Sequence, residues 1–177
     1  MVKKEPIGYR IYYPEKVLQQ LVDDPTKSIS DIAENIESYR QKVWRRKKKY
    51  EEKNIIWGYT SIVDESKLHH VMYIILMRLK PMSKDLCDIL IKRTSQKIPE
   101  KQHVRLLNVL YTNGYFDLMI MFSAPKHAIA RRYYDSLRTI YEPHLLEKPI
   151  IVDVNFALIR EGKVNPEVNE LYDFVPL

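Results

Sequence analysis

A dense run of basic residues near the N-terminus bears most clearly on chemistry. Seven of the ten residues from Arg40 to Lys49 are Lys or Arg, and none is acidic. Such a block creates a local positive field that attracts polyanions. Cations bind phosphate groups, and Arg and Gln side chains can also read guanine and adenine edges. The run therefore predicts contact with DNA, although a solvated helix face is the commoner reason for a charge run.

The helical phase of this run predicts which side chains face DNA. Val43, Arg46, Lys47 and Tyr50 are expected to turn toward the neighbouring helices. The predicted DNA-contacting residues are Tyr39, Arg40, Gln41, Lys42, Trp44, Arg45, Lys48 and Lys49.

Other residues with reactive side chains lack the spacing that chemistry requires. His69, His70, Cys87 and His103 do not follow a zinc-binding pattern. The sequence contains no Ser/His/Asp or Cys/His motif and no phosphate-binding loop. We therefore expect no metal, no cofactor and no enzymatic activity.

Three short helices are predicted to position the basic run. The first spans Pro14 to Asp24, the second begins at a cap formed by Ser30 and Asp31, and the third runs from Tyr39 to Lys53. Short helices joined by tight turns indicate a helix-turn-helix module of the winged-helix-like kind. In such a module the second of the paired helices enters the major groove, and here that helix is the basic one.

The second half of the chain is predicted to alternate between strands and helices. The order is strand, helix, strand, strand, helix, strand, over residues 70–79, 83–98, 104–111, 116–122, 126–141 and 150–159. Asn113 and Gly114 predict a tight hairpin between the second and third strands. This order predicts a ferredoxin-like βαββαβ domain, with a four-stranded antiparallel sheet and both helices on one face. The fold class is therefore α+β.

The other face of this sheet is expected to be apolar and uncovered in a single chain. Met119, Met121, Ile151, Ile159 and part of the first strand would lie on it. Because exposed apolar faces of this size usually mark interfaces, we expect a dimer that pairs sheet on sheet.

Length and composition exclude several classes of protein. The chain has 177 residues and a formal net charge of +6. Its longest apolar stretch, Val71 to Met77, is far shorter than the roughly 20 residues that span a bilayer. The N-terminus lacks the apolar run of a secretory signal, and Cys87 has no second cysteine to pair with. These features argue against membrane-spanning and secreted proteins, and we expect a cytoplasmic one.

The sequence resembles the Lrp/AsnC (feast/famine) transcriptional regulators, in their archaeal form, from about Pro14 to Ile159. The stretch 56–60, Ile-Trp-Gly-Tyr-Thr, matches the family's Ile and Gly-Tyr positions, and 113–118, Asn-Gly-Tyr-Phe-Asp-Leu, resembles its hairpin. Residues 30–34 resemble the family's second helix. Lys47 stands where the family usually buries Val or Ile, and Asn54 replaces a Gly that ends the recognition helix. Glu37 and Ser38 replace part of the usual Gly-Leu-Ser turn, so the helix-turn-helix is somewhat degenerate.

The resemblance implies a sequence-specific regulator that binds double-stranded DNA as a homodimer or higher oligomer. It also implies a small-molecule effector, commonly an amino acid, near the hairpin. Backbone N–H groups would bind its carboxylate, and Asp117 would accept from its ammonium group. The implied effector-binding residues are Thr112, Asn113, Gly114, Tyr115 and Asp117.

The resemblance also divides the chain by role. Residues 1–54 would bind DNA, 55–66 would link, 67–161 would bind the effector and oligomerise, and 162–177 would form a tail. The alternative is a small-molecule-binding or assembly protein of the same fold that has lost DNA binding. Lys47 and Ser38 favour this alternative, whereas the basic run favours the regulator.

Overall fold

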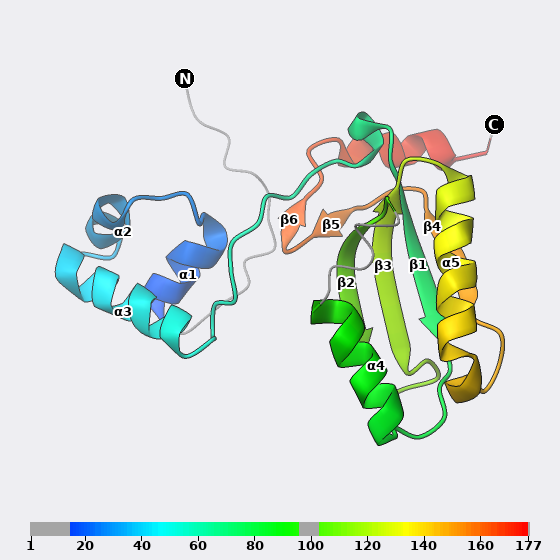
Figure 1. The fold of residues 1–177 in the computed structure, drawn as a ribbon. Helices are drawn as coiled ribbons and strands as arrows, with labels where there is room; N and C mark the ends of the chain where they lie inside the picture. The colour runs from blue at the N-terminus through cyan, green and yellow to red at the C-terminus, as the bar shows by residue number, and fades with distance from the viewer. Residues whose placement is uncertain (1–14, 96–102, 177) are drawn as a thin grey trace. The chain divides into compact units, whose positions relative to one another are not determined.

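The computed structural model describes residues 15–95 and 103–176 (Figure 1). By its contacts the chain divides into two units. The helical unit contains the N-terminal helices and residues 157–176, and the sheet unit spans Val63–Phe156. No helix in the described parts of the chain is long and apolar enough to cross a membrane.

Three helices enclose the core of the helical unit. They are α1 (Lys16–Asp23), α2 (Ile29–Asn35) and α3 (Arg40–Glu52). Each contributes one apolar stripe, and the buried side chains are those of Val17, Leu21, Ile32, Ala33, Val43 and Tyr50. The three predicted helices are thus confirmed, and their boundaries differ from the predicted ones by a few residues.

The predicted cap of α2 was wrong by two residues. Ser28 is the N-cap, and its hydroxyl oxygen accepts from the backbone N–H of Asp31 at 3.1 Å. The Asp31 carboxylate accepts in return from the N–H of Ser28 at 3.3 Å. This reciprocal pair satisfies two of the free N–H groups at the helix start, which a cap at Ser30 would not do.

The turn between α2 and α3 closes with a Schellman motif. Ser38 N–H donates to the carbonyl of Ala33 at 2.8 Å, and Glu37 N–H donates to that of Glu34 at 3.1 Å. The motif requires a left-handed residue, which here is Glu37 with φ 53°. At the end of α3, Asn54 has the same conformation at φ 53°, and Ile55 N–H donates to the carbonyl of Tyr50 at 2.9 Å. Asn at this position therefore preserves the helix end that the family forms with Gly.

Glu37→Gly is expected to stabilise the helical unit. A side chain in the left-handed conformation costs about 1–2 kcal/mol, and the extra backbone freedom of Gly offsets part of the gain, leaving about 0.5–1 kcal/mol. Urea unfolding followed by tryptophan fluorescence measures this, because the two tryptophans of the chain, Trp44 and Trp57, both belong to this unit. Glu34→Gly, inside α2, is the matched control and should destabilise by about 1 kcal/mol. Equal effects of the two substitutions would contradict the prediction.

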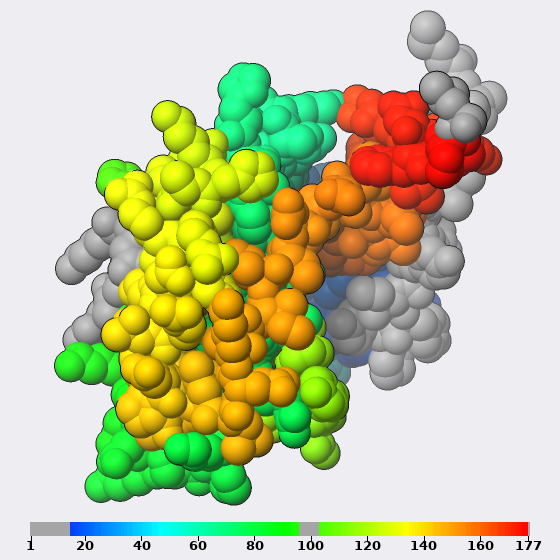
Figure 2. Space-filling view, turned by 90° about the vertical axis from the view of Figure 1, so that its right-hand side faces the viewer, coloured from blue at the N-terminus to red at the C-terminus, as the bar shows by residue number. Residues whose placement is uncertain are grey.

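The sheet unit has the predicted ferredoxin-like order. Its elements are β1 (Val71–Met77), α4 (Lys84–Ser95), β2 (Arg105–Tyr111), β3 (Leu118–Ala124), α5 (His127–Tyr141) and β4 (Ile150–Val154). The strands pair in the order β2-β3-β1-β4, with every neighbouring pair antiparallel. Figure 1 shows α4 and α5 on one face of this sheet. In the space-filling view, α5 (yellow) lies beside the segment that contains β4 (orange) (Figure 2).

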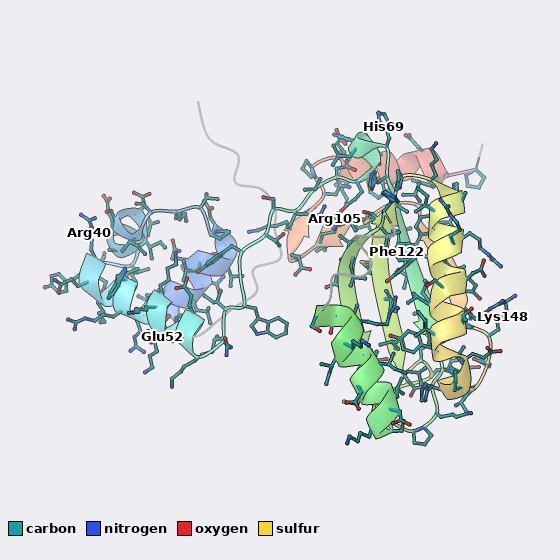
Figure 3. The ribbon with its side chains drawn as sticks, in the orientation of Figure 1. Arg40, Glu52, His69, Arg105, Phe122 and Lys148 are labelled. Carbon is teal, nitrogen blue, oxygen red and sulfur yellow. The ribbon has the colours of Figure 1, made fainter. Side chains whose placement is uncertain are left out.

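The core of the sheet unit lies between the sheet and these two helices. Alternate residues of the central strands point into it, including Ile75 of β1 and Phe122 of β3, which are both 0% exposed. Figure 3 labels Phe122 among them. Leu86 of α4 and Tyr133, Tyr134 and Leu137 of α5 meet them from the helix side.

The last predicted strand was too long. β4 ends at Val154, and Ile159–Arg160 (β5) pairs with Lys163–Val164 (β6) in a separate two-stranded hairpin. The turn of this hairpin is formed by Glu161 and Gly162, which have φ 48° and 75°. Two consecutive positive φ values are typical of the two-residue turn that joins twisted strands. The alternation of side chains that predicted one strand up to Ile159 therefore covers β4 and the start of the second hairpin.

The predicted open face of the sheet was partly wrong. Ile151 lies opposite Ile75 and packs against the core, so it points toward the helices. Ile159 lies outside the four-stranded sheet. Residues paired directly across strands share a face, so the open face consists of the residues in register with Ile74 and Leu76. Its apolar residues are Met72, Ile74, Leu76, Leu110, Met119, Met121, Ile150, Val152 and Val154, and the polar residues Asn108 and Ser123 lie on the same face.

Candidate nucleic-acid interface

The exposed side of α3 carries every residue predicted to contact DNA. Tyr39 is 83% exposed and Trp44 is 53% exposed, and the remaining predicted residues are exposed as well. Val43 and Tyr50 are buried, as their phase predicts. Arg46 was expected to turn inward and is exposed instead. In Figure 3, Arg40 and Glu52 mark the two ends of this helix.

Acidic partners neutralise only the C-terminal half of this surface. The Lys47 ammonium lies 4.0 Å from the Glu51 carboxylate, and that of Lys48 lies 3.6 Å from Glu52. Among the described residues, Arg40, Lys42, Arg45 and Lys49 form no ion pair. The N-terminal half of α3 therefore keeps its positive field, which favours contact with a polyanion there.

Two aromatic residues stand among the cations. The Lys48 ammonium lies 5.3 Å from the centre of the Trp44 ring, a cation–π distance. Tyr39 is the N-cap residue and forms no side-chain capping bond, so its ring projects from the start of the helix. The surface is therefore both basic and aromatic.

The connector after α3 accommodates Lys47. Lys47 packs over the ring of Tyr59 at 5.1 Å from its centre, and the Tyr59 hydroxyl donates to the Glu51 carboxylate at 3.0 Å. Burial and this bond to Glu51 raise the pKa of Tyr59 to about 12. The Glu51 carboxylate and the Tyr59 ring thus hold the half-buried Lys47. The resemblance to Lrp/AsnC regulators implies an apolar side chain at this position. No sequence pattern predicts this three-residue contact.

Tyr50 also takes a polar partner at the foot of α3. Burial raises its pKa to about 12, and a hydrogen bond to Glu15 acts in the same direction. Glu15 is the N-cap of α1, where its carboxylate accepts from the N–H of Leu18 at 2.9 Å. One carboxylate therefore starts α1 and ties it to α3, which fixes the orientation of the basic helix.

The loop between β2 and β3 is the second candidate site, and its geometry differs from the predicted tight turn. The strands end at Tyr111 and resume at Leu118, so six residues connect them. The φ of Gly114 lies outside the left-handed region, and a Cβ added there would meet no atom within 4 Å. The prediction of a tight turn at Asn113 and Gly114 is therefore wrong, because six residues form the loop and it does not require a positive φ at Gly114.

Asp117 has a structural partner in this loop. Its carboxylate accepts from the backbone N–H of Leu79 at 2.7 Å, and Thr112 Oγ1 donates to the carbonyl of Phe116 at 2.6 Å. The N–H groups of residues 113–115 donate to none of the described residues. Asp117 thus anchors the loop to the end of β1, and three backbone donors of the same loop have no acceptor among the described residues.

Arg78 adds a cation that sequence reasoning missed. Its guanidinium lies 4.4 Å from the centre of the Tyr115 ring and 3.5 Å from the Glu147 carboxylate. These residues come from three separate segments, so no sequence spacing brings them together. Arg78, Glu147 and Asp117 therefore place positively and negatively charged side chains together at one end of the sheet.

The fold is shared with solved transcriptional regulators. No protein-family model and no curated protein matches the sequence. An AsnC family transcriptional regulator from Agrobacterium tumefaciens matches with 19% identity and a TM-score of 0.61, over 86% of this chain and 94% of that one. LrpC of Bacillus subtilis matches with 17% identity and a TM-score of 0.59, over 81% and 92% of the two chains. A Neisseria meningitidis regulator, solved as a complex with L-Met, matches with 16% identity and a TM-score of 0.61, over 88% and 95%.

These similarities cover more than nine-tenths of each of these solved chains and confirm the predicted fold class. The chain thus has the α+β architecture of Lrp/AsnC transcriptional regulators, and its structural neighbours are regulators rather than enzymes.

Proposed function

We propose that this protein is a DNA-binding transcriptional regulator of the Lrp/AsnC type that responds to a small-molecule effector in the cytoplasm. The observation that carries the proposal is the surface of α3, where five adjacent positions from Arg45 to Lys49 are all basic and four further cations or aromatics precede them. This helix follows a helix-turn-helix turn, and the second helix of such a pair enters the major groove. Binding of the full chain to duplex DNA, measured at several salt concentrations, tests the proposal.

The proposed division of labour keeps the boundaries expected from the sequence. Residues 1–54 would bind DNA, 55–66 would link, and 67–161 would oligomerise and bind the effector. The open face of the sheet supports dimerisation, because Leu110, Ile150 and Val152 are 48%, 45% and 39% exposed in the single chain. A continuous apolar face of this kind is stabilised by pairing with a second copy.

The loop at 112–117 supports binding of an amino acid. The N–H groups of residues 113–115, which donate to no described residue, suit a carboxylate, and the Asp117 carboxylate suits an ammonium group. The L-Met bound to the Neisseria regulator is of this class.

Asp117→Asn is expected to abolish the stabilisation of the chain by an amino-acid effector. The amide keeps an oxygen that can accept from Leu79 N–H, so the loop should survive, but the negative charge is lost. A thermal-shift screen of the twenty amino acids measures this, since a ligand at 100 times its dissociation constant adds about 2.7 kcal/mol. Asp135→Asn, on the outer side of α5, removes the same charge elsewhere and should leave the shift intact. An amino acid that stabilises wild type and Asp117→Asn equally would show that Asp117 is not a ligand group.

A protein of the same fold that has lost DNA binding is the second candidate. The half-buried Lys47 favours it, because this residue departs from the family at a core position of α3. The contacts of Lys47 with Glu51 and Tyr59 weigh against it, because they let the helix keep its packing.

A further inference from the structure

The C-terminal segment exposes acidic and aromatic side chains together. The last described helix, η4, spans Val168–Phe174, and every residue from Asn169 to Pro176 is exposed. Tyr172 is 77% exposed and Val175 is 62% exposed. Residues 164–177 include three acidic residues and no Lys or Arg. We call residues 168–175 the acidic tail.

The helix type sorts these side chains into stripes. In a 3₁₀-helix, residues three apart eclipse one another. Glu170 and Asp173 therefore form an acidic stripe, and Leu171 and Phe174 form an apolar stripe beside it. An exposed surface of this composition fits a partner that is both basic and apolar.

The acidic tail is presented by an ordered base. The β5–β6 hairpin precedes it, and Asn165 bonds to the hairpin's start through its N–H and its side-chain amide, which donate to the carbonyls of Leu158 and Ala157 at 2.9 Å each. Lys163 donates to the carbonyl of Asp23 at the end of α1. The tail therefore begins at the unit that carries α3.

The surface of α3 has the complementary composition. It carries the exposed cations Arg40, Arg45 and Lys49, and Trp44 on the same helix is 53% exposed with the Lys48 ammonium over its ring. Both surfaces remain exposed within one chain, so neither covers the other there. A second copy of the chain can offer each exposed surface one of opposite charge.

We infer that the acidic tail docks on the α3 surface of a second copy of this protein and competes there with DNA. Glu170 and Asp173 face the α3 cations in this contact, and the apolar stripe covers Trp44. The regulatory part of this inference rests on the proposed function, because a tail that occupies α3 lowers the fraction of the protein that is free to bind DNA.

The affinity of full-length variants for duplex DNA tests the competition. Glu170→Gln with Asp173→Asn removes the acidic stripe, and Asp85→Asn with Asp88→Asn removes the same charge from α4 as a matched control. If the tail occupies nine-tenths of the α3 surfaces, the tail variant should bind DNA about tenfold more tightly than the control. Leu171→Ala changes no charge, removes part of the apolar stripe and should tighten DNA binding in the same direction. Equal DNA affinities of the tail variant and the control would overturn the inference.

A second measurement separates the contact from DNA binding. A fluorescein-labelled peptide of residues 164–177 is titrated with the full-length Glu170→Gln, Asp173→Asn variant and followed by anisotropy. Binding that is lost when Arg45→Gln and Lys49→Gln are added supports docking on α3. Binding that persists in that variant, or no binding, overturns it. If the peptide binds through α3 and duplex DNA does not bind wild type, the docking stands and the proposed function fails.

Discussion

Replacing Arg45 and Lys49 by Ala is expected to weaken binding to duplex DNA by roughly a thousandfold at 100 mM salt. A dimer would lose four cations, and each phosphate contact contributes about 0.9 to the slope of log affinity against log salt concentration. The slope should therefore flatten by about 3.6, with a similar loss on every sequence. These two residues were chosen because neither forms an ion pair with a described residue, so their removal leaves no carboxylate unpaired.

Anisotropy titrations at four salt concentrations measure both the affinity and the slope. Lys84→Ala with Lys92→Ala is the matched control, because it removes the same charge from exposed positions of α4. If the two double variants lose the same affinity, net charge rather than the α3 surface determines binding, and the assignment of the interface is wrong.

Met119→Asp is expected to convert the proposed dimer into monomers. Met119 lies between Leu76 and Leu110 on the open face of the sheet. Two-fold symmetry would bury two carboxylates in the interface, and an unpaired buried charge costs several kcal/mol. The dimer dissociation constant should therefore rise by more than about a hundredfold.

Sedimentation equilibrium at micromolar concentration measures this effect. Ile91→Asp is the matched control, since Ile91 is 61% exposed on α4 and does not lie on the open face. A wild type that is monomeric at this concentration, or a Met119→Asp variant that remains dimeric, would contradict the sheet-on-sheet arrangement.

The features that the sequence predicted best are those that depend on local periodicity. The spacing of Val43 and Tyr50 placed them in the core of the helical unit, and the continuous apolar run of β1 identified a central strand. Asn54 was recognised as a residue that tolerates the left-handed conformation, and it adopts that conformation. Each of these outcomes is decided by residues within one or two turns along the chain.

The errors concern pairing between distant segments. Ile150 and Ile151 are both apolar, so the alternation of β4 could not say which of them faces the core. A shift of one residue moves every side chain of a strand to the other face, and only the register with Ile75 decides it. Asn113 and Gly114 suggested a two-residue turn, but the strand pairing ends earlier and leaves six residues. The Lys47–Glu51–Tyr59 and Arg78–Tyr115–Glu147 contacts likewise depend on tertiary packing.

The salt dependence of duplex binding by the wild-type chain tests the central claim most directly. About six phosphate contacts per dimer predict a log–log slope on the order of −5, with clear binding at 50 mM salt. Binding at 50 mM salt that weakens with this slope is the result that the proposed function predicts. Absence of duplex binding at 50 mM salt would contradict it and would favour a protein of this fold that has lost DNA binding.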